Sequence, residues 1–228
     1  MQTVLAGGRP LTLLAEKAAF IGASRTLLIA DAHIGKAVSF RALGVPVPRG
    51  TTSETLAALD ALIAKVGARR IVFLGDFLHS ARAHALATLA AVAAWRARHP
   101  ALEVVLVRGN HDDRAGDPPR ALGFRVEDEA WHDDGFAFCH HPRPQAGAYV
   151  LCGHLHPCIG IGGRAYDHLR LPCFWFGENV GVLPAFGAFT GMHPIRPGPR
   201  DRVYAVADDA VAAMHSRAAS TEAERRAA

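Results

Sequence analysis

Short, continuous apolar runs recur along this chain, and five of them end directly in a polar block. The runs are Leu27–Ala30, Ile71–Leu74, Val104–Val107, Phe136–Phe138 and Tyr149–Leu151. Runs of this kind, apolar at every position rather than at alternate ones, are typical of strands that are buried on both faces. We therefore predict five buried strands in a sheet or sheets covered on both sides.

Two amphipathic segments separate the first three of these strands. The first is predicted to begin near Thr51, where Glu54 completes the spacing of a capping box, and to end at Gly67. Its apolar residues follow helical intervals: Leu56, Leu59, Leu62, Ile63 and Val66. The second carries Leu86, Leu89, Val92 and Trp95 and ends before Pro100. The resulting order, β-α-β-α-β, predicts a parallel sheet.

Further elements are predicted before and after this β-α-β-α-β unit. Leu11–Leu14 and Ala18–Ile21 are expected to form a sheet edge, and residues 35–50 are expected to form a long loop. After Asp112, strands separated by Gly and Pro turns predict a second, largely antiparallel or mixed sheet. Its later members are Leu169–Phe176, Val180–Leu183 and Arg202–Val206. Two mixed sheets with helices outside would form an α/β fold of the four-layer α/β/β/α sandwich type.

Length and composition agree with one globular unit. The chain has 228 residues, half of them apolar, which is enough for a single domain over residues 1–216. Residues 217–228 contain no large apolar side chain and are expected to form a frayed or disordered tail. We see no apolar run near the roughly 20 residues that span a bilayer and no signal segment, so we expect a cytoplasmic protein without a membrane partner.

Charge and cysteine content narrow the function only slightly. The formal net charge of +4 is compatible with a polyanionic substrate and does not establish one. The cysteines Cys139, Cys152, Cys158 and Cys173 form no C-x-x-C pair. We interpret them as buried reduced thiols rather than metal ligands.

The polar blocks that follow the five strands carry the candidate chemistry. They are Asp31-Ala32-His33, Gly75-Asp76, Gly109-Asn110-His111-Asp112, Cys139-His140-His141 and Gly153-His154-Leu155-His156. In open α/β sheets, ligands bind at the carboxyl ends of the strands, so residues there face one crevice. The blocks together supply enough ligands for two metal ions.

The ligands divide into two predicted subsites. Asp76 is the candidate for a carboxylate that bridges the ions, since the absent side chain of Gly75 lets the backbone approach closely. Asp31, His33 and His156 would complete one site, and Asn110, His140 and His154 the other. The D-x-H and H-x-H spacings are explained if these segments are extended, because alternate residues then project to one side.

This donor set predicts both the metal and the reaction. Oxygen and imidazole ligands suit manganese, iron or zinc better than magnesium or calcium, and we favour manganese. Two divalent ions about 3.5 to 4 Å apart can activate a bridging hydroxide for in-line attack at phosphorus. We expect His111 to assist the leaving group and Asp112 to orient the His111 imidazole.

Other residues near the blocks are candidates for substrate contact. Lys36, Arg41 and Arg49 could hold a phosphate backbone, although each could equally be an ordinary solvated charge. His79 and His141 lie beside predicted ligands and could contact phosphate or support a ligand from behind.

The five blocks together resemble the calcineurin-like metallophosphoesterases, whose pattern of D-x-H, G-D, G-N-H-D/E, H and G-H-x-H is matched from Leu27 to His156. Three further segments are similar to a narrower family, the ligase-associated DNA damage response phosphoesterases (PdeM): Phe40–Thr52, Gly75–Ser80 and Leu183–Gly191. This resemblance implies a manganese-dependent phosphodiesterase or endonuclease that acts on nucleic acid or a nucleotide-like diester. It also implies functional association with a DNA ligase and a helicase.

Two other functions remain open. Some related phosphoesterases are pyrophosphatases that cleave a UDP-sugar lipid precursor, but we see no basic amphipathic helix that would dock on a membrane. A non-catalytic, phosphoesterase-like binding scaffold should have lost ligands, and none is missing. The sequence leaves open the natural substrate, endo- or exonucleolytic action and the oligomeric state.

Overall fold

The first of two β-sheets holds the strands that lead into the polar blocks. The computed structural model describes residues 1–47, 50–162 and 168–214. The first sheet has seven strands in sequential order: β1 (Gln2–Ala6), β2 (Arg9–Leu14), β3 (Ala18–Ile21), β4 (Thr26–Ile29), β5 (Arg70–Leu74), β6 (Glu103–Val107) and β7 (Arg125–Glu127). Strands β1 to β4 pair antiparallel and β4 to β7 pair parallel. The predicted parallel sheet and its antiparallel edge are confirmed.

The second sheet is mixed, as expected. Its nine strands are β8 (Trp131–Asp133), β9 (Phe136–Phe138), β10 (Tyr149–Cys152), β11 (Pro157–Gly162), β12 (His168–Phe176), β13 (Val180–Val182), β14 (His193–Pro194), β15 (Arg202–Ala207) and β16 (Ala210–Met214). Strand β10 runs parallel to both β9 and β13, whereas β12 pairs antiparallel with β11, β13 and β15. The five predicted buried strands correspond to β4, β5, β6, β9 and β10, each within one residue.

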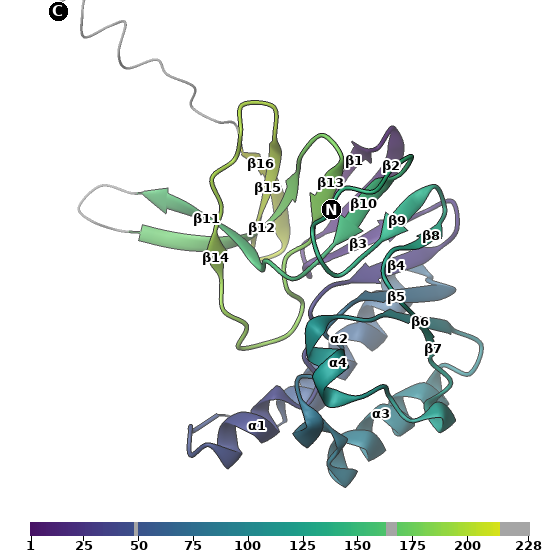
Figure 1. Ribbon diagram of the computed structural model, residues 1–228. Helices are drawn as coiled ribbons and strands as arrows, with labels where there is room; N and C mark the ends of the chain where they lie inside the picture. The colour runs from purple at the N-terminus through teal and green to yellow at the C-terminus, as the bar shows by residue number, and fades with distance from the viewer. Residues whose placement is uncertain (48–49, 163–167, 215–228) are drawn as a thin grey trace, which may run out of the picture.

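The helices come from one part of the chain and lie together beyond the first sheet (Figure 1). They are α1 (Lys36–Ala42), α2 (Thr51–Val66), η1 (Ala81–His84), α3 (Leu86–Arg98), α4 (Asn110–Ala115) and η2 (Arg120–Leu122). The α/β fold with two mixed sheets is therefore confirmed. In the described ranges no helix follows Leu122, so the second helical layer of a four-layer sandwich is not formed by these residues.

Two local predictions need correction. The expected loop at residues 35–50 contains helix α1, because Lys36–Ala42 includes no Gly or Pro and the breakers begin only at Gly44. The capping box at Thr51 does not form, because Gly50, with φ 93°, is the N-cap and Thr51 is already helical. The predicted end of α2 is confirmed, since Gly67 adopts φ 60° and closes the helix.

Alternating residues of the first sheet divide its core into two layers. Leu27 and Ile29 face α2 and α3, whereas Leu28 and Ala30 face the second sheet. The layer between the sheets also contains Phe174, which is fully buried. The four cysteines are buried and free, as predicted. Within the described residues, no helix combines the length and apolar character that crossing a bilayer requires.

The inter-sheet layer should carry a large share of the stability, because a buried aromatic side chain leaves a cavity when it is truncated. We expect Phe174→Ala to lower the free energy of unfolding by about 3 to 5 kcal/mol. Leu86→Ala, at a residue 89% exposed, is the matched control and should change it by less than about 0.5 kcal/mol. Equilibrium denaturation measures both, and equal losses would contradict this assignment of the core.

Candidate metal centre

The carboxyl ends of β4, β5, β6, β9 and β10 bring the five polar blocks to one place. Ligand atoms within 4.8 Å of one another form four overlapping groups: Asp31, His33 and His156; Asp31, Asp76 and His140; His140, His141 and His154; and His33, His79 and His111. Asn110 joins them through His140, because its Oδ1 lies 3.0 Å from His140 Nε2. The structure thus brings all seven predicted ligands together.

The first predicted subsite is centred on Asp31, which is fully buried. Asp31 Oδ1 lies 3.5 Å from His156 Nε2. His156 Nδ1 donates to the Gly191 carbonyl at 3.1 Å, which turns Nε2 toward Asp31. Burial, together with the charge of Lys36, lowers the pKa of His33 to about 2, so this imidazole stays neutral and able to bind a cation.

The second predicted subsite surrounds His140, which is also fully buried. His140 Nδ1 donates to the Leu74 carbonyl at 3.1 Å, which turns its Nε2 toward the other predicted ligands. This Nε2 lies 3.0 Å from Asn110 Oδ1, 3.0 Å from His154 Nδ1 and 3.5 Å from Asp76 Oδ1. Oxygen and nitrogen atoms of four predicted ligands therefore converge on one point, which is the arrangement that a cation stabilises.

Buried atoms without partners support the same interpretation. Asp31 Oδ1 and His33 Nδ1 are buried and make no hydrogen bond in the described residues. Unpaired buried polar atoms are costly, so their presence at one point needs a compensating group. The residues present fit divalent cations, and Asp76 shares a ligand group with Asp31 and His140.

Most of these side chains point toward the site because their backbone is left-handed, and not because alternate residues of a strand share one face. Five predicted ligands have left-handed φ values: Asp31 (52°), His33 (46°), Asp76 (50°), His154 (70°) and His156 (47°). The expectation that D-x-H and H-x-H are extended is therefore wrong. Each segment leaves its strand through left-handed residues, while Ala32 and Leu155 between them pack into apolar clusters.

Glycines beside the ligands make the close approach possible. A Cβ on Gly75 would lie 2.2 Å from His140 Nδ1, and one on Gly109 would lie 2.4 Å from Asp76 Oδ1. Gly75 therefore makes room for an imidazole from the second sheet, a more specific role than the close backbone approach that we predicted.

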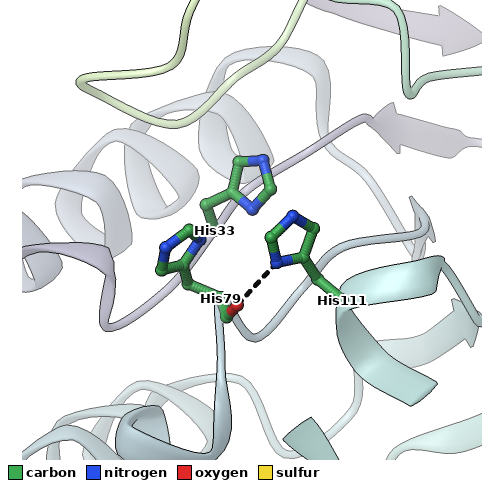
Figure 2. A group of neighbouring side chains, drawn as sticks. All are labelled: His33, His79 and His111. Carbon is green, nitrogen blue, oxygen red and sulfur yellow. Dashed lines mark hydrogen bonds between the residues drawn. The ribbon is translucent and has the colours of Figure 1, made fainter. Parts of the chain in front are cut away.

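His111 lies at the edge of the centre, and its orientation differs from our expectation. Its backbone N–H donates to Asp76 Oδ1 at 2.9 Å, and its Nδ1 donates to the His79 carbonyl at 2.7 Å (Figure 2). Nε2 is then directed toward the site, 3.9 Å from Asp76 Oδ2.

Asp112 does not orient His111. Its carboxylate accepts hydrogen bonds from the backbone N–H groups of Phe77, Leu78 and Gly109 at 3.0 to 3.3 Å. Burial raises the pKa of Asp112 to about 6, although these bonds oppose the rise. Asp112 therefore secures the two loops that carry Asp76 and Asn110, and the His79 carbonyl orients the imidazole.

The three basic residues that we predicted as substrate contacts differ in burial and position. Lys36 is partly buried on α1, where burial lowers its pKa and where the charges of Asp31 and Asp76 oppose the shift. Arg41 is exposed near the end of the same helix, and Arg49 lies outside the described residues.

The two candidate histidines contact predicted ligands. His79 stacks on His111 with ring centroids 5.0 Å apart, and both rings lie beside His33 (Figure 2). Burial and Lys36 lower the pKa of His79 to about 4. The His141 ring lies 4.5 Å from that of His154.

Glu129 is a supporting residue that the sequence did not indicate. The backbone N–H groups of His140 and His141 donate to its Oε2 at 3.0 and 2.9 Å, and His141 Nδ1 bonds its other oxygen. Burial alone would raise the pKa of Glu129, but these hydrogen bonds outweigh it and hold the pKa below its usual value. Because Glu129 follows no predicted strand and belongs to no motif, only the three-dimensional structure reveals it.

Comparisons with known proteins agree with this geometry. A sequence model described as calcineurin-like phosphoesterase matches residues 24–161, more than half of the chain. Among solved structures, the crystal structure of Pseudomonas putida nuclease MPE is similar, with 46% sequence identity and a TM-score of 0.84. That match covers 93% of this chain and 99% of the nuclease. A comparison with curated proteins found no match.

The support given by Glu129 should be measurable as metal affinity. We expect Glu129→Gln to weaken manganese binding by about 10- to 100-fold, because it removes the charge that fixes the loop carrying His140. Asp128→Asn is the control, since the Asp128 side chain is 86% exposed and pairs with Arg108 instead. Calorimetric titration of metal-free protein gives both affinities. A Glu129→Gln affinity equal to that of the control would show that the contact is dispensable.

Proposed function

Because the chain belongs to the calcineurin-like phosphoesterase family and is a metal-dependent phosphoesterase, we propose that it cleaves nucleic acid phosphodiesters at a binuclear manganese centre. The observation that carries this proposal is the convergence of Asp76 Oδ1, Asn110 Oδ1 and His154 Nδ1 on Nε2 of the fully buried His140. The nuclease named among the similar structures supports nucleic acid as the substrate.

The metal assignment rests on donor chemistry. Asp31 and Asp76 supply carboxylates, and histidines supply most of the other ligand atoms. Such a mixed shell favours manganese, iron or zinc over magnesium and calcium. Two ions held here would neutralise charge on the phosphate oxygens and activate water for in-line attack.

The protein's own groups then determine how the leaving group departs. His111 Nδ1 is already committed to the His79 carbonyl, so a proton gained by the ring resides on Nε2, which is directed toward the site. The ring is part-buried rather than enclosed, which leaves Nε2 accessible to a bound phosphodiester. His111 is thus suited to protonate the departing oxygen as a general acid.

The biological setting follows from the resemblance to the ligase-associated DNA damage response phosphoesterases. We propose that the chain acts in DNA repair in the cytoplasm, in functional association with a DNA ligase and a helicase. In this setting, cleavage should leave DNA ends that a ligase can process.

The bridging role of Asp76 gives the most direct activity test. We expect Asp76→Asn to abolish hydrolysis of a chromogenic phosphodiester in manganese, because a neutral amide cannot hold two cations together. Asp128→Asn should retain full turnover. An active Asp76→Asn variant with an unchanged unfolding midpoint would contradict the binuclear proposal.

The role of His111 predicts a dependence on the leaving group. His111→Ala should lower kcat for an oligonucleotide by about 100- to 10,000-fold, since a nucleoside alkoxide needs a proton. The loss should be much smaller with a p-nitrophenyl ester, whose phenolate leaves without protonation. Steady-state kinetics on the two substrates provide the comparison, and equal losses would exclude the general-acid role.

A further inference from the structure

The segment Leu183–Gly191 is anchored directly to the candidate metal centre. The backbone N–H groups of Phe186 and Gly187 donate to the carbonyls of Ala30 and Asp31, at 2.8 and 3.1 Å. At its other end, the Gly191 carbonyl accepts from His156 Nδ1 at 3.1 Å. The segment therefore lies over the Asp31 and His156 side of the centre and is held in place at both ends.

Phe189, at the tip of this segment, is unusual in both exposure and conformation. It is 49% exposed, which is more than any other Phe, Tyr or Trp among the described residues. Its φ is 57°, in the left-handed region that bulky residues rarely adopt. Backbone strain of this kind concentrates at functional sites.

A surface pocket of about 180 Å³ is bordered by both Phe189 and the predicted metal ligand His156. Its lining includes Lys17, His156, Phe189 and Met192. A smaller hollow bounded by Phe189, His33 and Lys36 lies next to it. Phe189 therefore borders two depressions, each of which also contains a predicted metal ligand.

Lys17 contributes positive charge to the pocket. Its Nζ donates to the Phe186 carbonyl at 2.9 Å, and an ammonium group has two further hydrogens to donate. The lysine is partly buried beside the segment that carries Phe189. The pocket thus combines an aromatic face, an apolar Met192 side chain and a cationic donor.

We propose that this pocket is a nucleotide subsite, in which Phe189 stacks on the base next to the scissile phosphate and Lys17 contacts the adjoining phosphate. The inference rests on the proposed nuclease function and names the substrate group that the Phe189 segment would hold. Because His156 lines the pocket and is also a predicted metal ligand, an occupant of the pocket would adjoin the cleaved bond. Stacking on an aromatic ring tolerates any base, so the subsite would add affinity without sequence preference.

The test uses manganese-loaded protein and oligonucleotides that carry one stable abasic residue, moved one position at a time past the cleavage site. Wild-type protein should lose about tenfold in kcat/KM when the missing base is the one that stacks. Phe189→Leu keeps the apolar bulk but not the aromatic face, so it should cleave the intact and abasic substrates equally. Phe189→Tyr should restore the discrimination, and Leu86→Ala should behave as wild type.

Binding gives an independent readout. A 2-aminopurine base at the sensitive position should be quenched on binding to wild-type protein and not on binding to Phe189→Leu. Lys17→Gln should reduce the salt dependence of binding by about one phosphate contact. If wild-type protein cleaves intact and abasic substrates equally at every position, the subsite is wrong and the nuclease function stands. If it cleaves no oligonucleotide, the proposed function fails first.

Discussion

Two buried carboxylates, Asp31 and Asp76, impose the constraint on which the rest of the structure depends. They are 0% and 2% exposed, and the described residues within ion-pair distance of them are all histidines. Burial lowers the pKa of the neighbouring His33 and His154, which favours the neutral form of these two rings. Two buried carboxylates at one point are costly, and divalent cations would remove that cost. The fold around the centre is accordingly a framework that keeps neutral ligands and negative charge together.

That framework is stabilised by conventional packing and is strained only at the site. Strands β4, β5 and β6 are buried on both faces, one against the helices and one against the second sheet. Their rigidity supports left-handed conformations at five ligand positions, each of which costs about 1 to 2 kcal/mol. Two hydrogen-bonding carboxylates hold the loops in register: Asp112 bonds the amides around Asp76, and Glu129 bonds those of His140 and His141. Strain at the site is thus offset by the core around it.

Much of this arrangement could be predicted from the sequence because strand burial and ligand type leave local signals. The five strands and the convergence of their polar blocks follow from continuous apolar runs and from the geometry of α/β sheets. Three features escaped prediction because they depend on tertiary contacts: the left-handed turns at Asp31 and His156, the His79 carbonyl that orients His111, and the support from Glu129. Helix α1 was not predicted for a different reason: the Gly and Pro residues that follow it, from Gly44 to Gly50, made the whole segment resemble a loop. The proposed subsite residues Lys17 and Phe189 lie outside the five polar blocks, and only the fold brings them beside His156.

We propose that two metal ions share this site through Asp76. Electron paramagnetic resonance of the protein loaded with manganese tests it directly, because two bridged ions couple magnetically and separate ions do not. The account predicts two manganese ions per chain with a coupled spectrum, and an uncoupled spectrum for Asp76→Asn at the same occupancy. A wild-type protein that binds one ion per chain, or two ions with no coupling, would contradict it.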